Sequence, residues 1–278
     1  MNIPHRFRRS YCGPVRAVVF DWAGTTVDYG CRAPTEVFRR VFAQAGVDIT
    51  MDEARGPMGT YKKDHLRALL QMPAVATRWQ AAYGRLPDER DVETLYAQFE
   101  PLQIACVTQY ADLIPGTLQT VAAIRGRGIR IGSSTGYTAA MMEPLVAAAR
   151  EQGYDPDAIV TMSHVPAGRP APWMCFENAR RLDVYPMQAV ITVDDTPVGI
   201  EAGLNAGTWT AAVVRTGNEV GLSLEEVAAV NADELQRRLD RAATRLAHAG
   251  AHYVLDSIAE LPACVDDVER RLRGGELP

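Results

Sequence analysis

The sequence of 278 residues predicts an α/β protein, a doubly wound parallel sheet with an inserted helical cap. Apolar runs of strand length alternate with amphipathic helical segments, which is typical of a parallel sheet with helices on both faces. Residues 30–112 lack any strand pattern, and acidic or hydroxyl residues stand at several predicted strand ends. We therefore expect a core domain from 14–29 and 113–278, a helical cap domain from 30–112, and an N-terminal extension over 1–13.

The first predicted strand ends in an acidic residue. Residues 15–21 form an apolar run that closes on Asp21, and Gly24, Thr25 and Thr26 follow at once. A buried parallel strand delivers such a carboxylate into a tight polar loop at its carboxyl end. There it is placed for nucleophilic attack or for metal binding. The alternative is an aspartate that only caps a turn.

The next 80 residues read as helices. Apolar side chains recur at helical spacing over 34–45, and another helix is expected to start near residue 59. A helical stretch surrounds 79–83, and a long helix from about 88 carries apolar residues every third or fourth position to 110. This block is predicted to be a small bundle above the strand ends.

The remaining chain alternates between helix and strand. Strands are predicted at 128–133, 158–161, 189–193 and 208–214, with helices at 117–126, up to about 151, from about 172 and from 197. Active sites in such folds lie beyond the carboxyl ends of the strands. Asp21, Thr135, Asp194 and Asp195 are therefore expected to meet in one site.

Lysine usage is unusual. Of 29 basic residues only Lys62 and Lys63 are lysines, and all others are arginines. A lysine amine forms an imine with an aldehyde, which a guanidinium does not. A helix that begins near residue 59 places Lys62 and His65 on adjacent turns of one face. The alternative is an arginine-biased composition that leaves two lysines on a helix surface.

Two segments can bind an anion. Ser134, Thr135 and Gly136 offer a hydroxyl and free N–H groups before a helix, although the same residues also make a good helix cap. The proline-pinned loop 165–170 presents Arg169, whose guanidinium suits a bidentate grip on phosphate. The alternative for this loop is an ordinary surface turn.

A pair of acids after the strand at 189–193 can bind a cation. Oxygen ligands of this kind suit Mg²⁺, which keeps several waters and takes few carboxylates. Either aspartate could instead cap the following helix. We assign Asp195 to the metal, and Asp194 and Thr196 to its support.

Composition limits the possible partners and compartment. A net charge of −5 argues against general nucleic-acid binding. No apolar run approaches the ~20 residues of a membrane helix. The five cysteines are scattered without C-x-x-C spacing, which is typical of reduced thiols in a cytoplasmic protein.

Four motifs together resemble the phosphonoacetaldehyde hydrolases (phosphonatases) of the haloacid dehalogenase superfamily. They lie at 20–28, 58–65, 133–138 and 165–174, and the resemblance runs from about Arg16 to the C-terminus. The first motif alone gives only the superfamily, whereas the second, with Ala23, points to this family. The resemblance implies a haloacid dehalogenase-like core and hydrolysis of phosphonoacetaldehyde to acetaldehyde and phosphate, in 2-aminoethylphosphonate degradation.

The resemblance also implies roles for individual residues. Asp21 would be the nucleophile and Lys62 the imine-forming lysine, unless the motif is offset and Lys63 takes that place. Mg²⁺ would be held by Asp21, the carbonyl of Ala23 and Asp195, and the protein would be a homodimer paired through the cap. Contacts to the phosphoryl group would come from Thr135, Gly136 and Arg169, and residues beside the substrate or lysine would be His65, Tyr137, Met58 and Cys31.

Two departures from related enzymes leave alternatives open. Phosphatases of the superfamily carry a second aspartate, which protonates the leaving oxygen, where this chain has Ala23. Many relatives have a further acid where Gly199 and Ile200 stand here, so a sparse metal shell is expected. The competing functions are a Mg²⁺-dependent phosphatase or phosphomutase and a non-catalytic phosphonate- or phosphate-binding protein.

Overall fold

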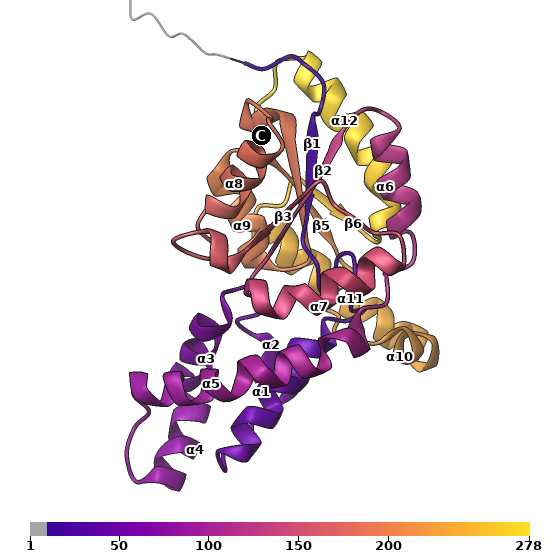
Figure 1. The fold of residues 1–278 in the computed structure, drawn as a ribbon. Coiled ribbons are helices and arrows are strands. Elements are labelled where there is room, and N and C mark those ends of the chain that lie inside the picture. The colour runs from indigo at the N-terminus through magenta and orange to yellow at the C-terminus, as the bar shows by residue number, and fades with distance from the viewer. Residues whose placement is uncertain (1–9) are drawn as a thin grey trace, which may run out of the picture.

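The computed structural model describes residues 10–278, and its centre is a six-stranded parallel sheet in the order β3-β2-β1-β4-β5-β6 (Figure 1). Residues 1–9 of the expected N-terminal extension lie outside the described residues. β1 is central, and the winding direction of the chain reverses between β1 and β4. The strands are β1 (Ala17–Phe20), β2 (Arg130–Thr135), β3 (Ala158–Thr161), β4 (Val190–Asp194), β5 (Trp209–Val213) and β6 (Tyr253–Leu255).

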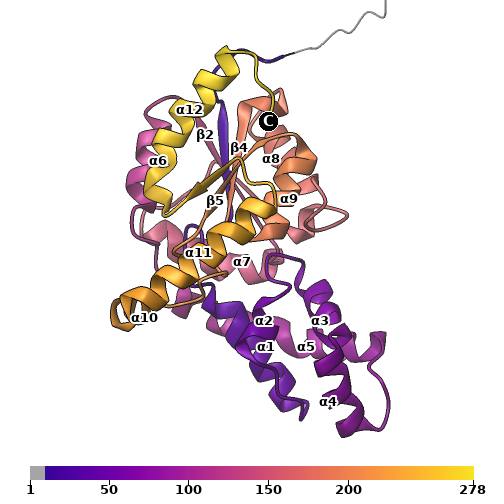
Figure 2. The ribbon, with the colours of Figure 1, turned by 180° about the vertical axis from the view of Figure 1, so that it is seen from behind.

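Helices cover both faces of the sheet because the strand side chains alternate (Figures 1 and 2). Val18 and Phe20 join the apolar cluster shared with α6 (Thr117–Arg125), α7 (Ala139–Glu151) and α12 (Leu261–Arg273). Ala17 and Val19 face the opposite side. That side is covered by α8 (Trp173–Arg181), α9 (Pro197–Ala206) and α11 (Ala232–His248).

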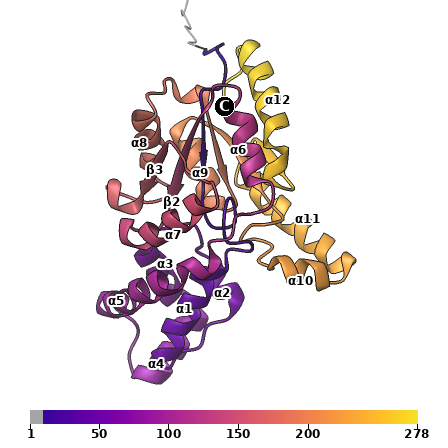
Figure 3. The ribbon, with the colours of Figure 1, turned by 45° about the vertical axis from the view of Figure 1, so that its right-hand side comes forward.

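The cap lies beyond the carboxyl edge of the sheet (Figure 3). Residues 30–112 contain helices and no strand. The long helix α5 packs against both α1 and α3. The cap helices are α1 (Arg32–Gln44), α2 (Met51–Arg55), α3 (Lys62–Gln71), α4 (Pro73–Tyr83) and α5 (Glu89–Cys106), followed by the 3-10 turn η1 (Val107–Tyr110). The predicted doubly wound sheet with an inserted helical cap is thus confirmed.

Several element boundaries differ from expectation. The helix expected near residue 59 begins at Lys62, because Gly59 has a φ of +89°, which a right-handed helix excludes. β2 lies two residues later than expected, because Gly128 has a φ of +76° and still belongs to the turn before the strand. The sequence pattern did not predict the helices α2, α10 (Leu224–Ala229), α11 and α12 or the strand β6.

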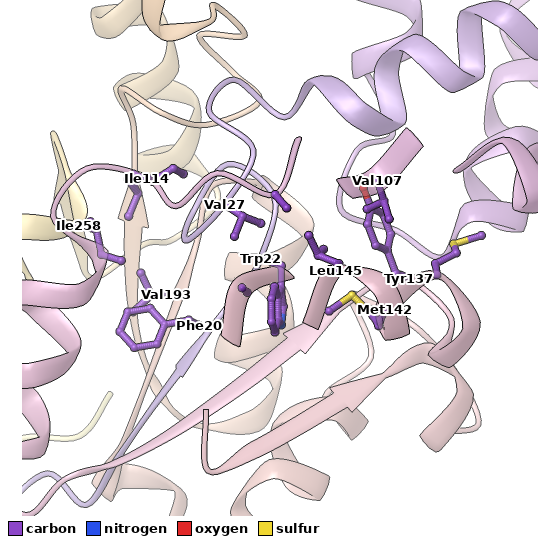
Figure 4. Packing of buried hydrophobic residues seen from close by; sticks show 14 of the residues in the cluster. Phe20, Trp22, Val27, Val107, Ile114, Tyr137, Met142, Leu145, Val193 and Ile258 are labelled. Carbon is purple, nitrogen blue, oxygen red and sulfur yellow. The ribbon is translucent and has the colours of Figure 1, made fainter. Parts of the chain in front are cut away.

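The turn after β1 is fixed by burial and by hydrogen bonds. Trp22 is fully buried in the apolar cluster that also holds Leu145 and Met142 (Figure 4). The Thr26 hydroxyl donates to the backbone carbonyl of Asp21 at 3.0 Å. These contacts hold the chain at the point where it leaves the sheet toward the cap.

Candidate active site

The register of the sheet brings three side chains to one level. Phe20 pairs with Ser133 on one side and with Val193 on the other. The next residue of each strand is therefore Asp21, Ser134 or Asp194. Because the winding reverses between β1 and β4, this edge is also where ligands bind in open α/β sheets.

Arg169 joins the three strand ends. Its Nη1 lies 2.7 Å from Oδ1 of Asp21 and 3.1 Å from Oδ2 of Asp194. Its Nη2 donates to the carbonyl of Ser134 at 3.1 Å and to the hydroxyl at 2.8 Å. Burial opposes the charge of Arg169, but Asp194 and Asp21 outweigh it and raise its pKa. A fixed, permanent cation therefore stands beside the predicted nucleophile.

Asp195 lies directly behind the turn after β1. Its Oδ2 accepts from the backbone N–H of Asn218 at 2.7 Å, and its Oδ1 accepts from the Thr25 hydroxyl at 3.3 Å. A Cβ on Gly24, whose φ is +87°, would lie 2.3 Å from the same Oδ2. The glycine of the first motif is therefore required both for its backbone conformation and for the close approach of this carboxylate.

Three buried carboxylates share this corner with a single arginine. Burial raises the pKa of Asp21 to about 7 against the effect of Arg169, and burial with its neighbours Asp21 and Asp194 raises that of Asp195 strongly. Such a cluster favours a bound cation. Among residues 10–278 no three His, Cys, Asp or Glu side chains are arranged to hold a metal. Two carboxylates with the Ala23 carbonyl and waters nevertheless match what Mg²⁺ requires.

The cap contributes Lys62, which is buried at the start of α3. Its Nζ lies 3.8 Å from the Met58 sulfur and stands over the rings of Tyr137 and Phe38, 5.0 and 5.7 Å from their centroids. Burial lowers the pKa of Lys62 to about 8. A substantial neutral fraction is therefore present near neutral pH, as nucleophilic attack on a carbonyl requires.

The two adjacent lysines occupy different environments. Lys62 lines the same cavity as Asp21, whereas Lys63 pairs with Glu93 of α5. Of the two, only Lys62 is positioned to meet a substrate in this cavity.

The cavity between cap and core is narrow, with a volume of about 20 Å³, enough for about one water molecule. Glycines allow this close approach. A Cβ on Gly59 would lie 2.4 Å from Oγ1 of Thr196, and one on Gly136 would lie 2.5 Å from the carbonyl of Thr60. The cavity is lined by Asp21, Ala23, Cys31, Pro34, Met58, Gly59, Lys62, Thr135, Gly136, Tyr137, Arg169 and Thr196.

His65 does not line the cavity. Its ring stacks on Phe38 at 3.8 Å between centroids, and its Nε2 is 3.0 Å from the carbonyl of Ala54. Burial and the nearby Lys62 lower its pKa well below the usual value. His65 is therefore a neutral ring buried inside the cap between Phe38 and the Ala54 carbonyl, and, contrary to the expectation from the sequence, it does not face the cavity.

Three residues at the site were missed by sequence reasoning. Arg55 of α2 donates to the carbonyls of Gly30 and Gly221 at 2.8 and 2.9 Å, which ties cap to core. Asn218 connects the Arg55 carbonyl to Asp195. Gln103 of α5 donates to the Tyr137 hydroxyl at 3.3 Å. None of the three belongs to a recognisable motif, and only the fold brings them to the site.

Comparisons with known proteins identify the family of this chain. The sequence profile of haloacid dehalogenase-like hydrolases matches residues 15–207. A phosphonoacetaldehyde hydrolase-like protein of Syntrophobacter fumaroxidans is 51% identical, with 98% of this chain and 99% of the relative covered. The phosphonoacetaldehyde hydrolase of Bacillus cereus is 46% identical, with 92% and 97% covered. The chain belongs to the phosphonoacetaldehyde hydrolase family.

A solved structure extends the likeness to the whole fold. The phosphonoacetaldehyde hydrolase-like protein of Oleispira antarctica superposes with a TM-score of 0.96 at 43% identity and covers 99% of this chain and 100% of its own. The protein is therefore a hydrolase, of a family that generally depends on a divalent metal ion. Over residues 10–278 none of its helices has the length and apolar character needed to cross a bilayer.

Proposed function

We propose that this protein hydrolyses the carbon–phosphorus bond of phosphonoacetaldehyde, giving acetaldehyde and phosphate in 2-aminoethylphosphonate degradation. One observation carries the proposal. An amine on the cap, Lys62, and a carboxylate on the core, Asp21, line one cavity, and residue 23 between core and cap supplies no acid. This arrangement suits a carbon leaving group. Such a group needs an electron sink, which an imine on Lys62 supplies, and it has no oxygen that must be protonated.

The chemistry follows from the residues. The neutral Lys62 amine attacks the aldehyde, and loss of water leaves a protonated imine. Asp21 then attacks phosphorus, and the electrons of the carbon–phosphorus bond move into the imine to form an enamine. Protonation at carbon and hydrolysis release acetaldehyde and free Lys62, and water cleaves the aspartyl phosphate at Asp21.

Other residues around the cavity support the reacting pair. Arg169, Thr135 and the Gly136 N–H would hold the phosphoryl oxygens. The rings of Tyr137 and Phe38 beside the Lys62 nitrogen favour a cation there, including the protonated imine. Met58 and Cys31 complete the walls and help to exclude water.

The fit described above makes Mg²⁺ the metal that we propose for this site. Asp21, the carbonyl of Ala23 and Asp195 would hold it, with Asp194 and Thr196 in support. When bound, the ion neutralises charge on the phosphoryl group and on the buried carboxylates. The absence of an acid at Gly199 leaves water to complete its coordination.

We further propose a cytoplasmic homodimer that pairs through the cap. Exposed apolar side chains at the outer part of the cap, Tyr83 and Leu86, support this surface. Sedimentation velocity of the wild type and of Leu86→Asp tests it. A monomeric wild type would rule out this assembly.

The deciding experiment separates the candidate functions. Purified protein with phosphonoacetaldehyde and Mg²⁺ is assayed for acetaldehyde, in parallel with p-nitrophenyl phosphate and with an EDTA control. Metal-dependent release of acetaldehyde with little ester hydrolysis is expected. Ester hydrolysis alone would indicate a phosphatase, and binding without turnover a non-catalytic protein.

A further inference from the structure

Asp194 and Gly199 are too close for both to carry a side chain. A Cβ on Gly199 would lie 1.9 Å from the carboxyl carbon of Asp194, and 2.0 and 2.1 Å from its oxygens. Gly199 lies within the helical turn that opens α9, so its backbone conformation is one that any residue adopts. The need for glycine here comes from the space that the Asp194 carboxylate occupies.

Both oxygens of the Asp194 carboxylate have partners, one in an ion pair and the other in two hydrogen bonds. Oδ2 lies 3.1 Å from Nη1 of Arg169, the same nitrogen that contacts Asp21 at 2.7 Å. Oδ1 accepts from the Thr196 backbone N–H at 2.9 Å and from its hydroxyl at 2.7 Å. Asp194 thus shares the Arg169 cation with the predicted nucleophile. Without it, this nitrogen would pair with Asp21 alone and hold the attacking oxygen more tightly.

We propose that Asp194 is a positioning residue for Arg169, and that Asp194 and Gly199 form an exchangeable pair. The carboxylate that orients Arg169 can come from the end of β4 or from the first turn of α9, but not from both. The kinetic part of this inference rests on the proposed function, and its structural part does not.

Position 199 is able to carry that carboxylate. It is the third residue of α9, and Thr196 caps the helix by accepting from the Gly199 N–H at 3.2 Å. An acidic side chain at this place is favoured by the helix dipole and by the free N–H groups of the first turn. The Cβ at position 199 would begin where the Asp194 carboxyl carbon now lies, so its carboxylate would enter the surroundings of Arg169.

The test is a reciprocal exchange. Asp194→Gly is expected to lower kcat on the order of a hundredfold, with less than about a threefold change in KM, because Arg169 is misplaced but still present. Gly199→Asp alone is expected to unfold at a lower temperature and to be equally slow. The double variant Asp194→Gly/Gly199→Asp is expected to recover kcat to within about tenfold of the wild type.

A matched control distinguishes the effect of the added Cβ at position 199 from the effect of the carboxylate charge. Asp194→Gly/Gly199→Ala accepts the added Cβ but brings no carboxylate. It should unfold at a higher temperature than Gly199→Asp, because the space is free, and remain as slow as Asp194→Gly, because no carboxylate meets Arg169. If the exchanged variant is as stable as the wild type yet no faster than this control, the inference is wrong.

A role confined to holding Thr196, the residue that caps α9, gives a different result. Asp194→Asn keeps an oxygen for the Thr196 N–H and removes the charge beside Arg169. We expect an unfolding temperature close to that of the wild type and a kcat as low as that of Asp194→Gly. A wild-type kcat in this variant would show that Asp194 only holds Thr196 in place and does not position Arg169.

A crystal structure of the exchanged variant provides a readout independent of activity. The introduced carboxylate should lie within about 3.5 Å of an Arg169 nitrogen, the range of a direct ion pair. A carboxylate turned toward solvent would overturn the inference. If the wild type released no acetaldehyde, the proposed function would fail, and this structure together with the unfolding temperatures would still decide the inference.

Discussion

At the scale of single residues, the two adjacent lysines provide a test with its own control. Lys62→Arg keeps a cation in the buried position but cannot form an imine, so turnover and borohydride trapping should both be abolished while the fold is kept. Lys63→Arg should retain both, because Lys63 pairs with Glu93 away from the cavity. Near-normal turnover by Lys62→Arg would refute the imine mechanism.

The lowered pKa of Lys62 predicts how imine formation depends on pH. With a pKa of about 8, about half of the amine is neutral at pH 8 and about a tenth at pH 7. The rate of borohydride trapping should therefore rise about tenfold per pH unit below 8 and level off above it. Mass mapping of the reduced adduct identifies the lysine. A rise that continues to pH 10 would show that Lys62 is not desolvated in solution.

Asp21→Ala distinguishes imine formation from phosphoryl transfer. The variant should lose turnover but still form the borohydride-trapped adduct, because the amine attacks carbon and Asp21 attacks phosphorus. Loss of Asp21 also removes a negative neighbour of Lys62, which lowers the pKa of the lysine further. An untrappable variant with a normal unfolding transition would show that Asp21 is needed before the imine forms.

At the scale of elements, the spacing of apolar residues was sufficient to predict the core as far as β5 and the main helices of the cap. It failed where a glycine at positive φ shifts a boundary, as at Gly59 and Gly128. The site shows the same division. Residues in motifs at strand ends, such as Asp21 and Thr135, were predictable because parallel strands deliver their ends to one edge. Arg55, Asn218 and Gln103 were not, since each acts through a cap–core contact that the sequence does not encode locally.

One of these contacts links a cap helix to the aromatic wall of the site. Gln103 of α5 is fully buried and donates to the Tyr137 hydroxyl at 3.3 Å, and the Tyr137 ring lies 5.0 Å from the Lys62 nitrogen. Gln103→Met leaves that hydroxyl unpaired, which costs about 1–3 kcal/mol of stability. We expect kcat to fall about tenfold and the trapping midpoint to move to lower pH, because the ring that favours the Lys62 cation is displaced.

Two controls accompany this prediction. Gln71→Met on the exposed part of α3 should change neither kcat nor the midpoint. In Gln103→Met/Tyr137→Phe both partners are removed, so part of the lost stability should return. An unshifted midpoint in Gln103→Met would show that Tyr137 keeps its place without the amide.

At the scale of the whole molecule, the cap is closed on the core and leaves room for about one water molecule. We expect that a substrate enters while the cap is open and that closure excludes water from the reacting groups. Several contacts join the cap to the core. Gln103 donates to the Tyr137 hydroxyl at 3.3 Å, and the Thr138 hydroxyl donates to the Glu100 carboxylate at 2.9 Å. Arg55 donates to the carbonyls of Gly30 in the cap and Gly221 in the core, and Gly59 and Gly136 leave no room for a Cβ beside Thr196 and Thr60.

The buried carboxylates of the site destabilise the folded protein when no metal is bound. Asp21, Asp194 and Asp195 lie together, with Arg169 paired to the first two and Lys62 near Asp21, so ionisation of all three carboxyls is opposed in the metal-free protein. Asp195→Asn removes one charge while keeping an acceptor for Asn218. In EDTA at neutral pH this variant should unfold at a higher temperature than the wild type, because burial and the neighbouring carboxylates oppose ionisation of Asp195 and an amide does not ionise.

Metal addition should reduce that difference in stability, because the wild type alone keeps the complete proposed metal site. Ligand binding to the native state at a hundredfold excess over Kd stabilises by about 2.7 kcal/mol, which corresponds to roughly 5–10 °C in a chain of this size. Mg²⁺ should therefore raise the unfolding temperature of the wild type and leave that of Asp195→Asn unchanged, as followed by calorimetry with Ca²⁺ as a comparison cation. Equal shifts in both proteins would place the metal away from Asp195, and the repulsion among the carboxylates would then need another counterion.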